Sequence, residues 1–193
     1  AFGVLFFVLV LGANTPELLL IALGQDPFDG AELQVLAVGK ELELRGPMRA
    51  GIAAEVRRLI ESHPSVRVLH LNSPGGWVAE GRYLASVIRS HSLTTYTATG
   101  CSSSCVTAFV AGSHRVIFEE ARLGLHSSSG SRIDPVYIGA ANEALGTPLR
   151  DLGASEDFVS RALGTPADSL WFPPHDELLA NHLVDEVSDG AGT

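Results

Sequence analysis

Three consecutive hydroxyl side chains, Ser102, Ser103 and Ser104, lie in a segment whose surroundings favour nucleophilic chemistry. The preceding residues, 93–99, are rich in β-branched side chains and predict a buried strand. Gly100 ends that strand, and apolar residues then recur at helical spacing. A strand, a sharp turn and a helix start present a serine at the edge of an α/β sheet, beside N–H groups that stabilise a developing negative charge. Helix capping is the alternative role, because serine is a favoured N-cap residue.

Two further segments carry polar groups at the ends of predicted strands. Residues 72–76 read Asn-Ser-Pro-Gly-Gly and follow the strand predicted at 66–71. The glycines there allow close approach of a substrate to backbone N–H groups, although a plain tight turn has the same composition. His126 ends the strand predicted at 122–126, before a serine-rich loop, where its ring can reach a neighbouring hydroxyl. A surface histidine without function is the alternative.

The elements that must position these groups alternate between strands and helices. Alternating and β-branched runs predict the strands, and apolar residues at helical spacing predict the helices. We expect strands at 33–38, 41–45, 66–71, 93–99, 115–118 and 122–126, and helices at 49–62 and 77–90. A strand–helix–strand order produces crossover connections, so the predicted fold class is α/β.

The composition of the 193-residue chain limits its partners. The net charge is −9 and no basic run exceeds Arg57-Arg58, which argues against nucleic acid as a partner.

Cys101 and Cys105 are the two cysteines, and within one helix they would be too far apart for an unstrained bridge. Two small buried thiols are therefore expected, with a bridge left open if Cys101 lies in the turn. No zinc-ligand spacing is present, and we expect neither a metal nor a cofactor.

The first residues form an apolar segment. Residues 2–23 carry one charge, Glu17, and nearly reach the length of a spanning helix. A signal peptide is the alternative, but the segment lacks a basic start and a small-residue cleavage site. We therefore predict a truncated membrane segment at 1–24, a linker at 25–30 and a folded domain at 31–193. No lysine or arginine precedes Lys40, which places the domain on the non-cytoplasmic side of a membrane by the positive-inside rule.

The order of these motifs resembles the ClpP/crotonase superfamily. Asn-Ser-Pro-Gly-Gly is followed by a helix, a strand, a serine that opens a helix ending in Ala-Gly, and a strand ending in Leu-His. The similarity is to the branch of the Clp protease proteolytic subunit and signal peptide peptidase A. The Cys-x-Ser-x-Cys form and Leu-Trp-Phe-Pro at 170–173 resemble a membrane-anchored ClpP-like group of bacteria. The resemblance covers about 41–187 and implies a fold of repeated β-β-α crossover units.

The resemblance also implies roles for particular residues. Ser103 matches the nucleophile when Ala-Gly is aligned, with its two serine neighbours as alternatives. His126 matches the general base, because a serine hydroxyl is a weak nucleophile until a base takes its proton. The backbone N–H groups of Gly76 and Ser104 match the oxyanion-hole donors, and Gly75 lies where an extended peptide substrate would pair.

The third member of the family's triad is a carboxylate. The position of the family's acid falls near Leu170, so Asp168 is the closest carboxylate, with Asp134 and Asp151 as alternatives. A dyad without an acid is also open. A serine–lysine dyad is not expected, because the only lysine, Lys40, precedes the serine.

The resemblance implies a serine peptidase that works through an acyl-enzyme at or near a membrane. Its substrate would be a peptide or protein, and residues 132–161 would supply the helical arm through which the family forms homo-oligomers. Two other classes stay open. One is a non-catalytic membrane scaffold, and the other is a crotonase-type acyl-CoA enzyme, which shares the oxyanion hole but needs no serine nucleophile.

Overall fold

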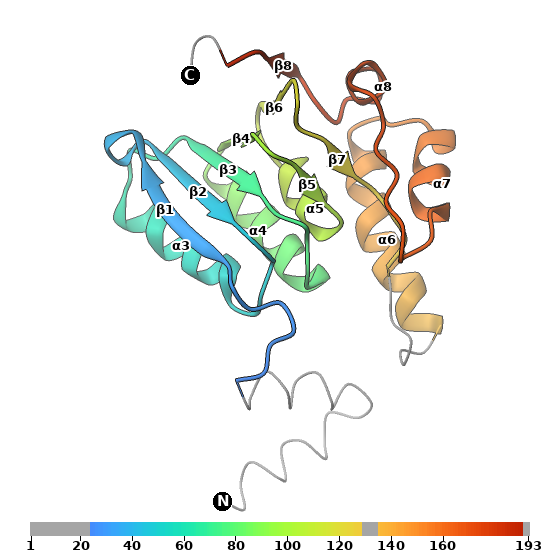
Figure 1. Ribbon diagram of the computed structural model, residues 1–193, viewed down its shortest axis with the longest axis horizontal. Helices are drawn as coiled ribbons and strands as arrows, with labels where there is room; N and C mark the ends of the chain where they lie inside the picture. The colour runs from blue at the N-terminus through green and yellow to red at the C-terminus, as the bar shows by residue number, and fades with distance from the viewer. Residues whose placement is uncertain (1–23, 129–134, 191–193) are drawn as a thin grey trace, which may run out of the picture.

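A six-stranded sheet organises the chain, in the order β1-β2-β3-β4-β6-β8 (Figure 1). The computed structural model describes residues 24–128 and 135–190. The strands are β1 (Glu32–Leu36), β2 (Glu41–Arg45), β3 (Val68–Asn72), β4 (Thr94–Thr97), β6 (Arg115–Phe118) and β8 (Glu186–Ser188). β1 pairs antiparallel with β2, and the other neighbours are parallel. Parallel pairs require crossover connections, and the helices supply them.

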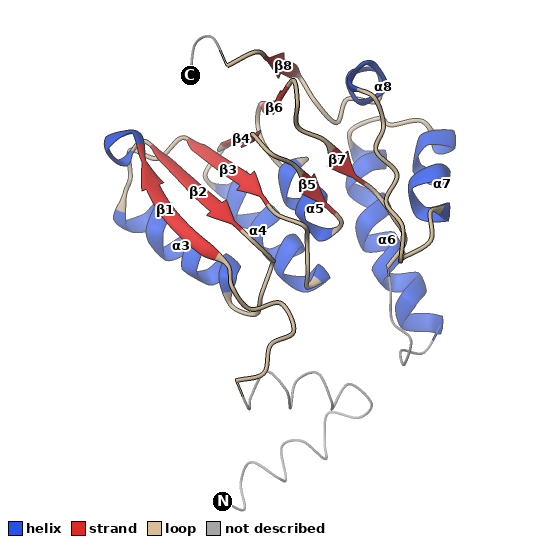
Figure 2. Ribbon diagram, viewed as in Figure 1, coloured by secondary structure: helices blue, strands red, loops and turns tan. Residues whose placement is uncertain are grey.

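One face of this sheet carries the hydrophobic core. Leu42, Leu44, Leu69 and Leu71 alternate along β2 and β3 and are fully buried, because successive side chains of a strand point to opposite faces. Three helices cover this face (Figure 2). They are α3 (Ile52–Ser62), α4 (Val78–Ser90) and α5 (Ser104–Phe109).

A second, two-stranded sheet lies beside the main one and leads to the remaining helices. β5 (Cys101–Ser102) pairs in parallel with β7 (Leu123–Gly124). The chain then forms α6 (Pro135–Asp151), α7 (Glu156–Gly164) and α8 (His175–Ala180). α6 packs against α7 and also contacts α4 and α5 (Figure 1). A short 3-10 turn, η1 (Ala37–Gly39), joins β1 to β2.

The predicted α/β class is confirmed, and the predicted elements are present with shifted ends. The helix predicted at 77–90 matches α4 closely, whereas only Leu123–Gly124 of the strand predicted at 122–126 is paired as a strand. The membrane segment predicted at 1–24 lies outside the described residues except for its last position. Among residues 24–128 and 135–190, no helix is both long enough and apolar enough to cross a membrane.

The segment predicted as a linker, 25–30, makes specific contacts with the domain. Oδ2 of Asp26 accepts a hydrogen bond from the backbone N–H of Ala50 at 2.6 Å. The ring of Phe28 packs edge-on against the ring of Trp77, with 5.2 Å between the centroids. The folded unit therefore begins before residue 31.

The two cysteines form a disulfide, so the expectation of two free thiols is wrong. The Cα atoms of Cys101 and Cys105 are 5.4 Å apart, inside the range that a disulfide bridges. Cys101 lies in β5 rather than in the helix, so the helical spacing assumed for the pair does not apply.

Candidate active site

Ser103 occupies a sharp bend between β5 and α5. Its backbone has φ 56° and ψ −129°, a combination that residues with a side chain rarely adopt. It is the N-cap residue of α5, yet its hydroxyl makes no capping hydrogen bond. The hydroxyl is therefore not used for capping, which was the alternative role for a serine at this position.

The three serines differ in exposure. Ser103 is half-buried, whereas Ser102 and Ser104 are 9% and 0% exposed. The hydroxyl of Ser104 is buried without a hydrogen-bond partner in the described residues. Of the three, Ser103 is the one that a substrate can reach most readily.

Hydrogen bonds from two neighbouring chain segments hold the bend. The N–H of Ser103 donates to the carbonyl of Gly124 at 2.8 Å, and the N–H of Ser102 donates to the carbonyl of Ser73 at 2.9 Å. These bonds fix the bend between β7 on one side and the segment after β3 on the other. The serine is thus held by strand pairing that its own sequence neighbourhood does not contain.

The Gly75-Gly76 turn packs directly against this bend. Gly75 has φ +95°, and a Cβ atom there would lie 2.6 Å from the carbonyl oxygen of Ser102 and 2.7 Å from Cβ of Ser103. Only glycine fits at this distance and in this backbone conformation. A change in the backbone of the Gly75-Gly76 turn would therefore displace Ser103.

The orientation of Gly76 follows from its pairing with Met48. The N–H of Met48 donates to the carbonyl of Gly75 at 2.8 Å, and the N–H of Trp77 donates to the carbonyl of Met48 at 3.0 Å. In such a parallel bridge the two flanking residues, Gly75 and Trp77, make the hydrogen bonds, and the N–H of the residue between them points to the opposite side. The N–H of Gly76 therefore faces away from Met48.

The start of α5 offers a second free donor. Ser104 is the first residue of the helix, and the first N–H groups of a helix have no partner within it. The N–H of Ser104 and the N–H of Gly76 have no hydrogen-bond partner within residues 24–128 and 135–190. Two such donors near a serine hydroxyl are the requirement for an oxyanion hole.

His126 is held at its position by a segment about forty residues further along the chain. The preceding residue, Leu125, exchanges two backbone hydrogen bonds of 2.9 Å with Trp171. The following residue, Ser127, donates from its N–H to the carbonyl of Thr165 at 2.9 Å. Nothing in the sequence around His126 reveals this support.

The imidazole of His126 has one unsatisfied nitrogen. Nδ1 is buried and has no hydrogen-bond partner among the described residues. Buried polar atoms are normally paired, so this atom marks a place where an acceptor is missing. In a Ser-His-Asp triad this nitrogen is the one that donates to the acid.

None of the candidate acids in the described residues contacts His126. Asp168 is exposed and accepts a hydrogen bond from the hydroxyl of Ser169 at 3.3 Å. Asp151 is exposed at the end of α6, and Asp134 lies outside the described residues. In the part of the chain that the structure covers, no hydrogen bond or ion pair joins a carboxylate to His126.

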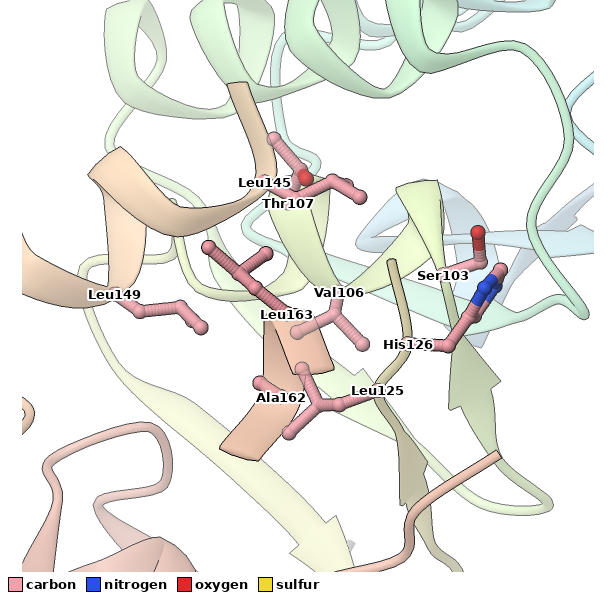
Figure 3. Close-up of a pocket in the computed structure, with 9 residues that line it drawn as sticks. All are labelled: Ser103, Val106, Thr107, Leu125, His126, Leu145, Leu149, Ala162 and Leu163. Carbon is pink, nitrogen blue, oxygen red and sulfur yellow. The ribbon is translucent and has the colours of Figure 1, made fainter. Parts of the chain in front are cut away.

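Ser103 and His126 line one small cavity (Figure 3). Its volume is about 10 Å³, which is room for about one water molecule. Figure 3 shows Ser103 and His126 together at one side of it and the apolar side chains on the other side. The remaining lining residues are Val106, Thr107, Leu125, Leu145, Leu149, Ala162 and Leu163.

Two negative observations complete the site, both for the described residues. No hydrogen bond joins the Ser103 hydroxyl to the His126 ring in this arrangement. No group of three or more histidine, cysteine, aspartate or glutamate side chains could hold a metal ion.

Comparisons with known proteins identify the fold. No protein-family model and no curated protein sequence matches the chain. Among solved structures, ClpP1 from Listeria monocytogenes superposes with a TM-score of 0.68 at 17% identity, over 79% of this chain and 93% of that one. A point mutant of the same Listeria ClpP1 gives a TM-score of 0.66, with the same identity and coverage. The chain therefore has the ClpP-like α/β fold.

Proposed function

We propose that this domain is a ClpP-like serine peptidase that cleaves peptide bonds through an acyl-enzyme. The observation that carries the proposal is the placement of Ser103. Its hydroxyl makes no helix-capping hydrogen bond, and its backbone forms a strained bend that packs against the Gly75-Gly76 turn. Ser103 also lines a cavity together with His126. A strained backbone that the surroundings maintain is typical of catalytic sites.

Each step of the reaction has a group to perform it. His126 takes the proton of the Ser103 hydroxyl while the oxygen attacks the substrate carbonyl carbon. The N–H groups of Gly76 and Ser104 receive the negative charge on the carbonyl oxygen. The protonated imidazole then gives its proton to the leaving amine as the peptide bond breaks. A water molecule, deprotonated by the same imidazole, releases the acyl group and restores the serine.

The contacts of the site favour a Ser103–His126 dyad over a complete triad. Within the described residues His126 Nδ1 lacks an acceptor, and Asp168, the proposed acid, is bonded instead to its neighbour Ser169. Asp168 is the acid expected from the sequence, and the proposed dyad does not require it. It lies between Thr165 and Trp171, the two backbone anchors of the His126 strand.

The apolar cavity suggests which residue the peptidase prefers before the scissile bond. Its walls are aliphatic except for Thr107 and the two proposed catalytic side chains. A small apolar side chain would gain burial there, whereas a charged one would lose hydration without a partner. We propose a small apolar residue, such as alanine, at this position of the substrate.

We also propose that the domain works at a membrane, on its non-cytoplasmic side, and as a homo-oligomer. The apolar residues 2–23 support the membrane location. The Cys101–Cys105 disulfide supports an oxidising compartment, because such bonds are rare in the cytosol. The likeness to the ClpP fold supports the homo-oligomer.

A fluorophosphonate probe tests the serine chemistry directly. We expect covalent labelling of the native protein at Ser103, complete loss in Ser103→Ala, and a loss of at least about 100-fold in His126→Ala. Ser62→Ala, which changes an exposed hydroxyl on α3, and Lys40→Ala should label normally. Full labelling of Ser103→Ala would show that the nucleophile is wrongly assigned.

Two observations favour a second candidate function, a non-catalytic scaffold. In the described residues Ser103 and His126 are not hydrogen-bonded, and Nδ1 has no acceptor. A folded protein that takes up no fluorophosphonate and cleaves no peptide would support the scaffold.

An acyl-CoA enzyme would instead retain its activity in Ser103→Ala, because that chemistry uses the oxyanion hole and needs no serine nucleophile.

A further inference from the structure

The disulfide encloses the proposed nucleophile. Cys101 is the first residue of β5, Cys105 is the second residue of α5, and Ser103 stands midway between them. The bond therefore ties a strand to the first turn of the helix across the bend. The closed loop contains only the residues that form the bend and the helix start.

Both sulfurs lie inside the protein. Cys101 and Cys105 are each 0% exposed and belong to the main hydrophobic core. A reductant in solvent cannot reach them while the domain is folded, because thiol–disulfide exchange requires direct attack on a sulfur. The bond is thus suited to a permanent structural constraint and not to a reversible switch.

The bend needs such a constraint. The backbone of Ser103 is in a region that is strained for a residue with a side chain, and such a conformation persists only when the surroundings enforce it. α5 has six residues, too few for a helix to be stable by itself. The usual side-chain cap is missing, since the Ser103 hydroxyl does not accept from the helix.

The short loop also limits what else the bond can do. The stabilisation that a disulfide gives by restricting the unfolded chain grows with the length of the closed loop. With a sequence separation of four, Cys101 and Cys105 close one of the shortest loops available. The principal effect of the bond is therefore expected at the bend itself.

We propose that the Cys101–Cys105 disulfide is a positioning element for acyl transfer. It holds Ser103 and the N–H of Ser104 in their reactive arrangement, and without it the bend relaxes to a less reactive backbone. The proposal rests on the serine peptidase function proposed above. The two cysteines touch neither substrate nor reacting atoms, so they act through the serine that they flank.

The test compares the same protein with and without the bond. The purified chain is unfolded and then refolded either in dithiothreitol or in a mixture of oxidised and reduced glutathione. In the second case two protein thiols and one glutathione disulfide give the protein disulfide and two glutathione thiols, so atoms and electrons balance. Thiol alkylation and mass spectrometry confirm each state.

The readout is the rate of fluorophosphonate labelling at Ser103, together with kcat and KM for a peptide ester. We expect the reduced protein to label at least about tenfold more slowly, with the loss in kcat and little change in KM, because misplacing a reacting group lowers the rate of chemistry. Oxidation should restore the rate in the native sequence but not in Cys101→Ala/Cys105→Ala. Amide hydrogen exchange at 101–106 should be faster without the bond.

Three outcomes separate the possibilities. Slow labelling without the bond, in a domain that still unfolds cooperatively, supports the positioning role. Equal labelling rates for the oxidised, reduced and double-alanine proteins overturn it while leaving the proposed peptidase intact. No labelling even of the oxidised native protein removes the serine chemistry itself, and the positioning role with it. If the double-alanine variant does not fold, Cys101→Ser/Cys105→Ser and the reduced native chain serve the same comparison.

Discussion

Nε1–H of Trp77 donates a hydrogen bond of 3.0 Å to Oδ1 of Asp26, across 51 positions of the chain. Trp77 directly follows the Gly75-Gly76 turn, so this bond connects the segment before β1 to the proposed oxyanion hole. Asp26 also accepts from the backbone N–H of Phe28 and from that of Ala50. A segment that reads as a linker is thereby part of the support of the site.

Asp26→Asn is expected to destabilise the domain by about 1–2 kcal/mol at pH 7, since hydrogen bonds to a charged group are stronger than those to a neutral one. Burial alone would raise the pKa of Asp26, but the hydrogen bonds from Ala50, Phe28 and Trp77 outweigh it and hold that pKa below its ordinary value. A lowered pKa gives stability above the ordinary value, and that stability is lost as the pH falls through the folded-state pKa. The free energy of unfolding in urea, measured for the native protein and Asp26→Asn at pH 7 and below about pH 3, tests this. The difference between the two proteins should vanish in acid. A difference that persists unchanged in acid would contradict the assignment to the charged carboxylate.

Gly75→Ala should reduce fluorophosphonate labelling by at least about 100-fold, because the new methyl group would displace the Ser103 bend. Gly139→Ala in α6 is the matched control, since a Cβ atom there meets nothing within 4 Å. The control should label normally and be slightly more stable, as alanine is the better helix former. Normal labelling of Gly75→Ala would separate the turn from the site.

Asp168→Asn should change kcat/KM by less than about threefold, because its exposed carboxylate does not contact His126 and loss of a true triad acid costs about 10⁴. Asp151→Asn and Asp134→Asn, assayed in parallel with the same peptide, complete the set of candidate acids. A loss near the triad value in any one of the three would identify the missing partner of His126 Nδ1.

Leu163→Ala should enlarge the cavity beside Ser103 and shift the substrate preference. We expect kcat/KM for a peptide with leucine before the scissile bond to rise at least about tenfold relative to alanine, the range that one or two methylenes give in an apolar pocket. Leu179→Ala, an exposed leucine on α8, is the control. An unchanged ratio in Leu163→Ala would place the substrate elsewhere.

Removal of the apolar residues should release the domain from membranes without unfolding it. A chain of residues 24–193 keeps Asp26 and Phe28 and is expected to float free of lipid vesicles and to unfold cooperatively. A chain of residues 31–193 loses those contacts and should be less stable, by about the amount that Asp26→Asn costs or more. Vesicle co-sedimentation and thermal unfolding measure both, and an aggregated 24–193 chain would show that residues 1–23 belong to the core.

The sequence determined those features that depend on local pattern. Strand alternation and helical spacing predict the α/β order, and the glycines at 75 and 76 and the serine at 103 follow strand ends that are visible in the chain itself. Their convergence is a tertiary feature, because Ser103 follows β5 of the second sheet and a bridge between Ser73 and Cys101 joins that strand to the segment after β3. The resemblance to the ClpP superfamily rests on the same motifs.

Only the tertiary structure decided the contacts between segments distant in sequence. Cys101 lies in a strand, which allows the Cys101–Cys105 bond, and residues 165–171 support the backbone around His126. Asp168 is exposed, and its carboxylate accepts a hydrogen bond from Ser169. It also attached Asp26 to Trp77. These relations depend on how helices and loops pack to within about one ångström, and residue type and spacing do not specify distances that small.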